Sequence, residues 1–176
     1  KQRVLRYLKG TPHWGLRFEK ANGTWHVNGF GDASFAIKRS QTGIVIVFCG
    51  CTVAWRTGKQ PQVAKSTADS EVTALAATVV LAEYIRALLE SMLISIPMTR
   101  IHCDNRAAIV LSSGEGSWKT KALANRVQGV KDSVQRGEIE ILYVATNDQV
   151  ADSLTKFLSG NKQSVARSLL GMIPIQ

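Results

Sequence analysis

The chain has 176 residues, of which 45% are hydrophobic and 20% charged, a composition that suits one globular domain with a sizeable core. Lysine and arginine outnumber aspartate and glutamate by 22 to 13, so the formal net charge is +9. Such a basic surface favours phosphate-bearing partners, nucleic acid before anionic membrane, with a merely soluble basic protein as the alternative. No apolar run reaches the ~20 residues of a membrane-spanning helix, and we expect no membrane partner. Three cysteines are too few for a disulfide framework, which favours reduced thiols and an intracellular protein.

The N-terminal third of the chain predicts one helix and a set of strands. Residues 4–10 form the end of a helix that stops at its final glycine. Residues 16–35 hold two short strand-like runs around the Asn-Gly pair at 22–23, which indicates a hairpin. Residues 42–57 are rich in β-branched and aromatic side chains and are interrupted at Gly50, so two antiparallel strands are expected there.

Helices and strands alternate in the rest of the chain. Residues 66–94 carry apolar residues three and four positions apart, the spacing of a long amphipathic helix. We expect strands at 98–104 and 138–144, and helices at 105–113, 119–137 and 147–158. Three meandering strands followed by strand–helix units predict a mixed α/β sheet.

Only thirteen residues are acidic, and most of them fall at expected helix ends or solvent-exposed faces. Four do not. Asp32 and Asp104 end predicted strands. Glu71 lies about one turn into the predicted long helix, beside its apolar stripe, and Asp152 lies about one turn into the helix predicted over 147–158. If the two strands are neighbours in the sheet, Asp32 and Asp104 lie together at one end of it.

Carboxylates that converge without a basic partner repel one another and raise each other's pKa values. A divalent cation removes this repulsion, and hard oxygen ligands suit Mg²⁺ or Mn²⁺. A cluster of acids in a basic protein therefore predicts a place where metal and polyanion meet. The alternative is a scatter of helix caps and surface acids, with Asp104 as the cap of the helix that follows it.

At these residues the sequence resembles the ribonuclease H domain at the C-terminal end of Ty1/copia-type retrotransposon polyproteins. The resemblance covers nearly the whole chain. Five segments carry it in the family's order: "RVLRYLKGTPHWGLRF", "GFGDASFA", "SQTGIVIVFCGCTVAWRTGKQPQVAKSTADSEVTAL", "IHCDNRAAI" and "GEIEILYVATNDQVADSLTKFL".

The resemblance implies a ribonuclease H-like α/β fold, a five-stranded mixed sheet with helices packed on it. It implies that Asp32, Glu71, Asp104 and Asp152 are the catalytic acids and the ligands of two Mg²⁺ ions, for which Mn²⁺ can substitute. The implied reaction is hydrolysis of the RNA strand of an RNA–DNA hybrid during reverse transcription. The implied partners are that hybrid and the reverse transcriptase domain of the same polyprotein, with no small-molecule cofactor.

The resemblance also divides the chain and places it in the cell. Residues 1–24 are expected to connect to the reverse transcriptase, residues 25–160 to form the ribonuclease H domain, and residues 161–176 to form a tail or short helix. The expected location is cytoplasmic, in virus-like particles, or nuclear. The candidate phosphate contacts, each of which could instead be solvated surface, are Lys38, Arg39, Arg56, Lys59, Lys119, Lys121 and Arg126.

The sequence also departs from the family's pattern. Ser34 stands where the family often has a second acid, and Ala122 and Gln128 stand where it has histidines. The loop before Asp152 lacks the histidine found in cellular ribonucleases H. These losses suit slow turnover. They would also suit a domesticated copy that binds nucleic acid or protein without cutting, or a domain that only supports the reverse transcriptase.

Overall fold

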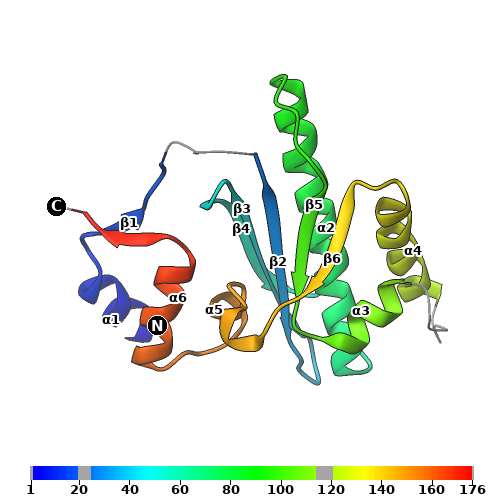
Figure 1. The fold of residues 1–176 in the computed structure, drawn as a ribbon. Coiled ribbons are helices and arrows are strands. Elements are labelled where there is room, and N and C mark those ends of the chain that lie inside the picture. The colour runs from blue at the N-terminus through cyan, green and yellow to red at the C-terminus, as the bar shows by residue number, and fades with distance from the viewer. Residues whose placement is uncertain (1, 20–24, 114–120, 176) are drawn as a thin grey trace.

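The computed structural model describes residues 2–19, 25–113 and 121–175. A five-stranded sheet in the order β4-β3-β2-β5-β6 forms its centre (Figure 1). The strands are β2 (Val27–Ser34), β3 (Gln41–Phe48), β4 (Cys51–Lys59), β5 (Thr99–Cys103) and β6 (Ile139–Tyr143). β2, β3 and β4 pair antiparallel, whereas β5 pairs parallel with both β2 and β6. The predicted mixed sheet is confirmed.

One face of the sheet is covered by α2 (Thr67–Ser91) and α4 (Lys121–Gln135), with α3 (Arg106–Ser113) beside them (Figure 1). Residues of α2 pack against inward-facing residues of the strands in the main hydrophobic core, among them Leu75, Ile46 and Ile101. A side chain of this kind contributes about 1.5–3 kcal/mol when fully buried. The predicted long helix and its buried stripe are therefore confirmed.

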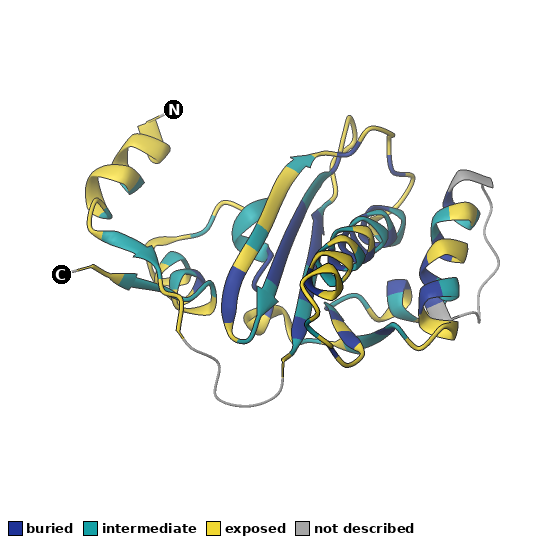
Figure 2. Ribbon diagram, turned by 90° about the horizontal axis from the view of Figure 1, so that it is seen from above, coloured by how far each residue is buried: buried dark blue, intermediate teal, exposed yellow. Residues whose placement is uncertain are grey.

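The same helix corrects one expectation. By length and composition α2 is long and apolar enough to cross a membrane, so the expectation that no apolar run reaches this length is wrong. Nine of its residues are buried within the described structure, and Figure 2 shows this helix packed along the sheet. Its apolar character is that of a core helix, because its buried face meets the β2 and β3 strands.

The opposite face of the sheet carries a smaller core. Val45 of β3 packs there with Val150 and Ala151, which lie just before α5 (Asp152–Thr155). The single helix predicted over 147–158 is wrong. The structure has a 3₁₀ turn, η1 (Thr146–Asp148), and then the four residues of α5.

The two ends of the chain meet beside this smaller core (Figure 1). The predicted first helix is present as α1 (Gln2–Gly10), and the C-terminal segment contains α6 (Gly160–Leu169). β1 (Trp14–Leu16) pairs antiparallel with β7 (Met172–Pro174). The predicted hairpin is therefore wrong, because β1 pairs with the C-terminal strand, and its Asn-Gly turn lies outside the described residues. The domain boundaries remain a prediction.

Candidate active site

Asp32 lies in the sheet, on β2, and its side chain is fully buried. The Thr155 hydroxyl donates a hydrogen bond to its Oδ2, and the Lys156 Nζ lies 3.4 Å from its Oδ1. Burial raises the pKa of the Asp32 carboxyl; the Thr155 hydrogen bond and the Lys156 charge lower it, and the carboxylates of Asp152 and Asp104 raise it further. The net direction is upward, so this acid is held in a place that disfavours its charge.

Asp104 follows β5 directly and is half-buried. Because β2 and β5 run parallel with Phe30 opposite His102, the residues two positions further on, Asp32 and Asp104, lie at the same end of adjacent strands. The Thr146 hydroxyl donates a hydrogen bond of 3.0 Å to Asp104 Oδ2. The predicted adjacency of the two strands is confirmed.

Glu71 comes from α2, whose start is well defined. Ser66 is the N-cap and accepts a hydrogen bond from the Asp69 backbone N–H, while Asp69 accepts one from the Lys65 backbone N–H. Glu71 follows about one turn later and is 5% exposed. Burial, followed by the charges of Asp32 and Asp104, raises its pKa to about 8.

One oxygen of Glu71 is left without a partner. The Ala33 backbone N–H donates to this carboxyl group, but Oε2 has no hydrogen-bond partner among the described residues. A buried polar atom of this kind costs about 1–3 kcal/mol unless a partner is supplied. An oxygen that is buried, unsatisfied and beside other acids suits a cation that the protein itself does not provide.

Asp152 is the first residue of α5 and is half-buried. Its Oδ1 accepts a hydrogen bond of 2.6 Å from Lys156 Nζ, one helical turn later. The Gln149 side chain donates to the backbone carbonyl of Gly31, next to Asp32 on β2, over 3.1 Å. This bond ties the segment before α5 to the strand that carries Asp32.

The four acids therefore converge from four separate elements. One oxygen from each of Asp32, Asp104 and Asp152 lies within 4.8 Å of the others. Glu71, Cys103 and Asp104 form a second group with ligand atoms within the same limit. The carboxylate oxygens of both groups are hard donors that fit Mg²⁺ or Mn²⁺, whereas the Cys103 thiol is not a donor of this kind. Asp104 is common to both groups.

Gly43 allows α5 to lie close against β3. A Cβ atom on Gly43 would lie 2.8 Å from Thr155 Cγ2 and 2.9 Å from both the Ala151 carbonyl oxygen and Leu154 Cβ. We expect Gly43→Ala to lower the free energy of unfolding by about 1–3 kcal/mol, because the backbone of this segment must move. Urea denaturation measures the change. Gly58→Ala on β4 is the control, since nothing lies within 4 Å of that Cβ; equal effects of the two substitutions would contradict the close-packing argument.

The structure adds residues that the sequence did not single out. Thr155 and Lys156 contact Asp32, and Thr146 contacts Asp104. Cys103 is buried beside Glu71. Burial raises the pKa of its thiol to about 12; a hydrogen bond with the Asn105 backbone opposes this rise, and the neighbouring acids add to it. Of these residues, only Lys156 could have been found from the sequence, because it follows Asp152 by four residues on an expected helix, the spacing of an ion pair.

The predicted phosphate contacts that the structure describes come from the loop between β2 and β3, from β4 and from α4. Lys38 and Arg39 are exposed in the loop between β2 and β3, and Arg56 and Lys59 are exposed on β4. Arg126 is half-buried and donates to Gln62 Oε1 over 3.0 Å and to Thr73 Oγ1 over 3.4 Å. The two other predicted contacts are not placed: Lys119 lies outside the described residues, as does the side chain of Lys121.

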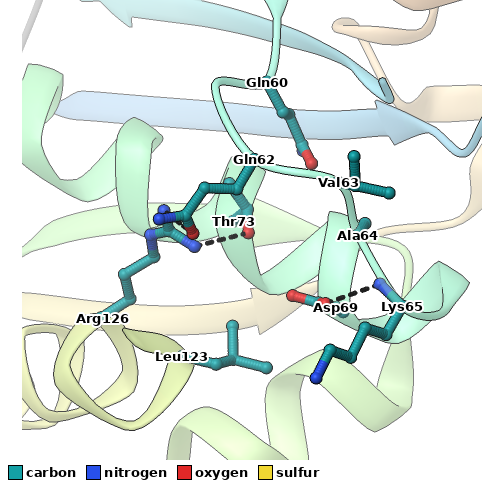
Figure 3. Close-up of a pocket in the computed structure, with 9 residues that line it drawn as sticks. All are labelled: Gln60, Gln62, Val63, Ala64, Lys65, Asp69, Thr73, Leu123 and Arg126. Carbon is teal, nitrogen blue, oxygen red and sulfur yellow. Dashed lines mark hydrogen bonds between the residues drawn. The ribbon is translucent and has the colours of Figure 1, made fainter. Parts of the chain in front are cut away.

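Arg126 borders a pocket of about 260 Å³ between α4, the start of α2 and the loop that precedes it (Figure 3). Lys65 and Asp69 line the same pocket. The four acids do not contribute to its described lining, so this pocket and the acid cluster are separate features.

Comparison with curated proteins finds long polyproteins. The chain is 32% identical to the retrovirus-related Pol polyprotein from transposon RE1 of Arabidopsis thaliana over 166 residues, which is 90% of the chain and 11% of that polyprotein. It is 29% identical over 174 residues to the retrovirus-related Pol polyprotein from transposon TNT 1-94 of Nicotiana tabacum, 96% of the chain and 13% of that polyprotein. The chain thus spans roughly a tenth of the length of these relatives. No family model matches it.

Comparison with solved structures finds ribonuclease H domains. The N-terminal ribonuclease H domain of a Mycobacterium tuberculosis protein aligns with a TM-score of 0.58 at 14% identity, over 82% of this chain and 99% of that one. A ribonuclease H1 from compost, solved in complex with an RNA/DNA hybrid, aligns with a TM-score of 0.54 at 12% identity, over 74% of this chain and 93% of that one. At these identities the likeness shows the fold, and the predicted ribonuclease H fold is confirmed.

Proposed function

This chain belongs to the retrovirus-related Pol polyproteins of copia-type retrotransposons and has the ribonuclease H fold, and on that premise we propose that it is a metal-dependent endonuclease. Its substrate is the RNA strand of an RNA–DNA hybrid formed during reverse transcription. Its protein partner during reverse transcription is the reverse transcriptase domain of the same polyprotein. The alternative is a domesticated domain that binds nucleic acid or protein without cleavage.

The convergence of four acids in a strongly basic protein carries this proposal. Asp32, Glu71, Asp104 and Asp152 come from two strands and two helices and meet at one end of the sheet. Burial raises the pKa values of Asp32 and Glu71, and repulsion from the neighbouring acids raises both further. Apolar residues at these positions would stabilise the fold more than acids that repel one another. The cluster therefore indicates a bound ligand.

The cluster fits divalent cations on a structural observation, the unpartnered Glu71 Oε2. Asp32, Asp104 and Asp152 would hold one ion, and Glu71 with Asp104 would hold the other. When bound, such ions supply an activated water and neutralise charge on the phosphate that is cleaved. The protein's own contribution is position: β2 and β5 set the separation of Asp32 and Asp104, and the Thr146 hydroxyl orients the Asp104 carboxylate.

Binding of the hybrid rests on the net charge of +9. Lys38, Arg39, Arg56 and Lys59 are exposed and are our proposed phosphate contacts, together with Arg126 and the undescribed side chains of Lys119 and Lys121. Contacts of this kind release counterions, so their strength falls steeply as salt rises. Affinity for the hybrid should therefore be independent of the acids and sensitive to salt.

A digestion experiment tests the proposal. Labelled RNA–DNA hybrid, duplex DNA and duplex RNA are incubated with the protein in Mg²⁺, Mn²⁺, Ca²⁺ or EDTA over a series of salt concentrations. We expect slow cleavage of the hybrid alone, in Mg²⁺ or Mn²⁺, that falls as salt rises and is poor in Ca²⁺, which tolerates looser geometry. The turnover is slow because a positioned acid–base group, here missing at Ala122 and in the loop before Asp152, typically contributes ~10²–10⁴-fold.

Two outcomes would contradict the proposal in different ways. Full activity in EDTA would remove the metal requirement. Tight, salt-sensitive binding of the hybrid with no cleavage in any metal would favour the domesticated binding module.

A further inference from the structure

A lysine lies inside the acid cluster. Lys156 Nζ is 2.6 Å from Asp152 Oδ1 and 3.4 Å from Asp32 Oδ1. Its side chain is 38% exposed, whereas that of Asp32 is 1% exposed, so the ion pair joins a partly exposed lysine to a buried acid. Asp32 and Asp152 are also two of the three acids whose oxygens could hold one cation. The ammonium group therefore binds two of the three carboxylates that could hold this metal ion.

Lys156 and a divalent ion cannot occupy this position together. Mg²⁺ binds carboxylate oxygens at about 2.0–2.1 Å, closer than the ammonium contacts found here. An ion bound to these two carboxylates would lie within a few ångströms of the Lys156 ammonium, and like charges at that separation repel strongly in a partly buried place. One of the two cations must leave.

The cluster is not symmetrical toward this lysine. The contacts of Lys156 are with Asp32 and Asp152, at one end of the cluster. Glu71 and Asp104 form the other end, and there Glu71 Oε2 has no partner within the described part of the chain. One end thus already holds a cation supplied by the protein, while the other presents an unsatisfied oxygen.

We propose that Lys156 sets the order in which the cluster takes up metal. This rests on the proposed function, since it assumes that the acids bind divalent ions. The first ion binds at the Glu71–Asp104 end. A second ion binds at the Asp32–Asp152 end only by displacing the Lys156 ammonium, which its flexible stem allows to swing into solvent.

Calorimetric titration of the full chain with Mn²⁺, without nucleic acid, tests this order. The wild type should show one tighter and one weaker binding event. Lys156→Met removes the competing charge and should strengthen the weaker event about tenfold or more, while the tighter event changes little. Lys156→Arg keeps a positive charge near the acids and should behave like the wild type. Lys162→Met is the matched control, because it removes the same charge from an exposed position on α6.

Thermal unfolding gives a second readout that does not depend on activity. In EDTA, Lys156→Met should melt at a lower temperature than the wild type, because the repulsion between Asp32 and Asp152 is no longer offset. Mn²⁺ should then raise its melting temperature more than that of the wild type, since stabilisation by a ligand grows with affinity. Equal or weaker Mn²⁺ affinity in Lys156→Met than in the wild type, with no larger rise in melting temperature, would overturn the proposal.

The result separates this inference from the proposed function. A wild type that binds Mn²⁺ and cleaves the hybrid, with a Lys156→Met variant that binds Mn²⁺ no more tightly, defeats only the role of Lys156. A wild type that binds no Mn²⁺ and cleaves nothing defeats both. A wild type with two Mn²⁺ events, the weaker one strengthened in Lys156→Met, and no cleavage supports the order of binding and defeats the nuclease.

Discussion

Asp32→Asn is expected to lower the rate of hybrid cleavage by more than about 100-fold while the protein stays folded. Loss of a group that merely supports a metal ligand typically costs 10–100-fold, and Asp32 is proposed as a direct ligand. The amide keeps the shape of the side chain and can still accept from the Thr155 hydroxyl. Because the place disfavours a negative charge on Asp32, the substitution should not lower stability in EDTA.

The experiment compares cleavage, hybrid affinity and thermal unfolding in the same preparations. Asp132→Asn is the matched control, an acid on α4 that is bonded to Gln128 and lies outside the cluster. We expect this control to cleave like the wild type, and Asp32→Asn to bind hybrid like the wild type at low salt. Normal turnover in a folded Asp32→Asn would remove this residue from the active site.

The arrangement of Asp32 and Asp104 could be predicted from the sequence because it depends on strand order. Two strands that end in an acid, once paired side by side and parallel, place both acids at one end of the sheet. Glu71 could be placed because the long helix has a regular apolar stripe, and the acid lies beside it. In each case a pattern within a short segment is enough to determine where the acid lies in the fold.

Other features depend on contacts between distant residues and have no local pattern. The segment at 16–35 has the composition of a hairpin, yet β1 pairs with β7 at the far end of the chain. Phe157, near the end of the helix predicted over 147–158, is 90% exposed. That segment is shaped by close packing of α5 against Gly43. Amphipathic spacing alone could not reveal a glycine on another strand.

The position of Lys156 shows the same limit within the site. A lysine four residues after an acid on a helix is ordinarily a surface pair of small energetic weight. Here the same ammonium group also contacts Asp32, a buried acid that lies far away in the sequence, so Lys156 is more than half of a surface pair. The chemistry of this lysine therefore follows from the docking of α5 on the sheet.

Glu71→Gln is expected to make the protein more stable than the wild type at pH 8 in EDTA, by on the order of a few kcal/mol. The pKa of Glu71 is raised from 4.5 to about 8 in the folded protein, first by burial and then by Asp32 and Asp104. Between these two values the folded state holds a proton that the unfolded state has released. The stability of the wild type therefore falls as pH rises from about 4.5 to about 8, and each pKa unit corresponds to about 1.36 kcal/mol.

Urea denaturation in EDTA at pH 5 and pH 8 measures this effect. The amide cannot ionise, so the loss of stability between the two pH values should be smaller in Glu71→Gln than in the wild type. Glu90→Gln on the same helix is the control, because its surface pair with Arg86 should contribute little. Mn²⁺ should restore stability to the wild type at pH 8 and less so to Glu71→Gln, since the cation stabilises the carboxylate that burial disfavours. An identical loss of stability from pH 5 to pH 8 in both proteins would mean that neither burial nor the neighbouring acids raise the pKa of Glu71 in the folded protein.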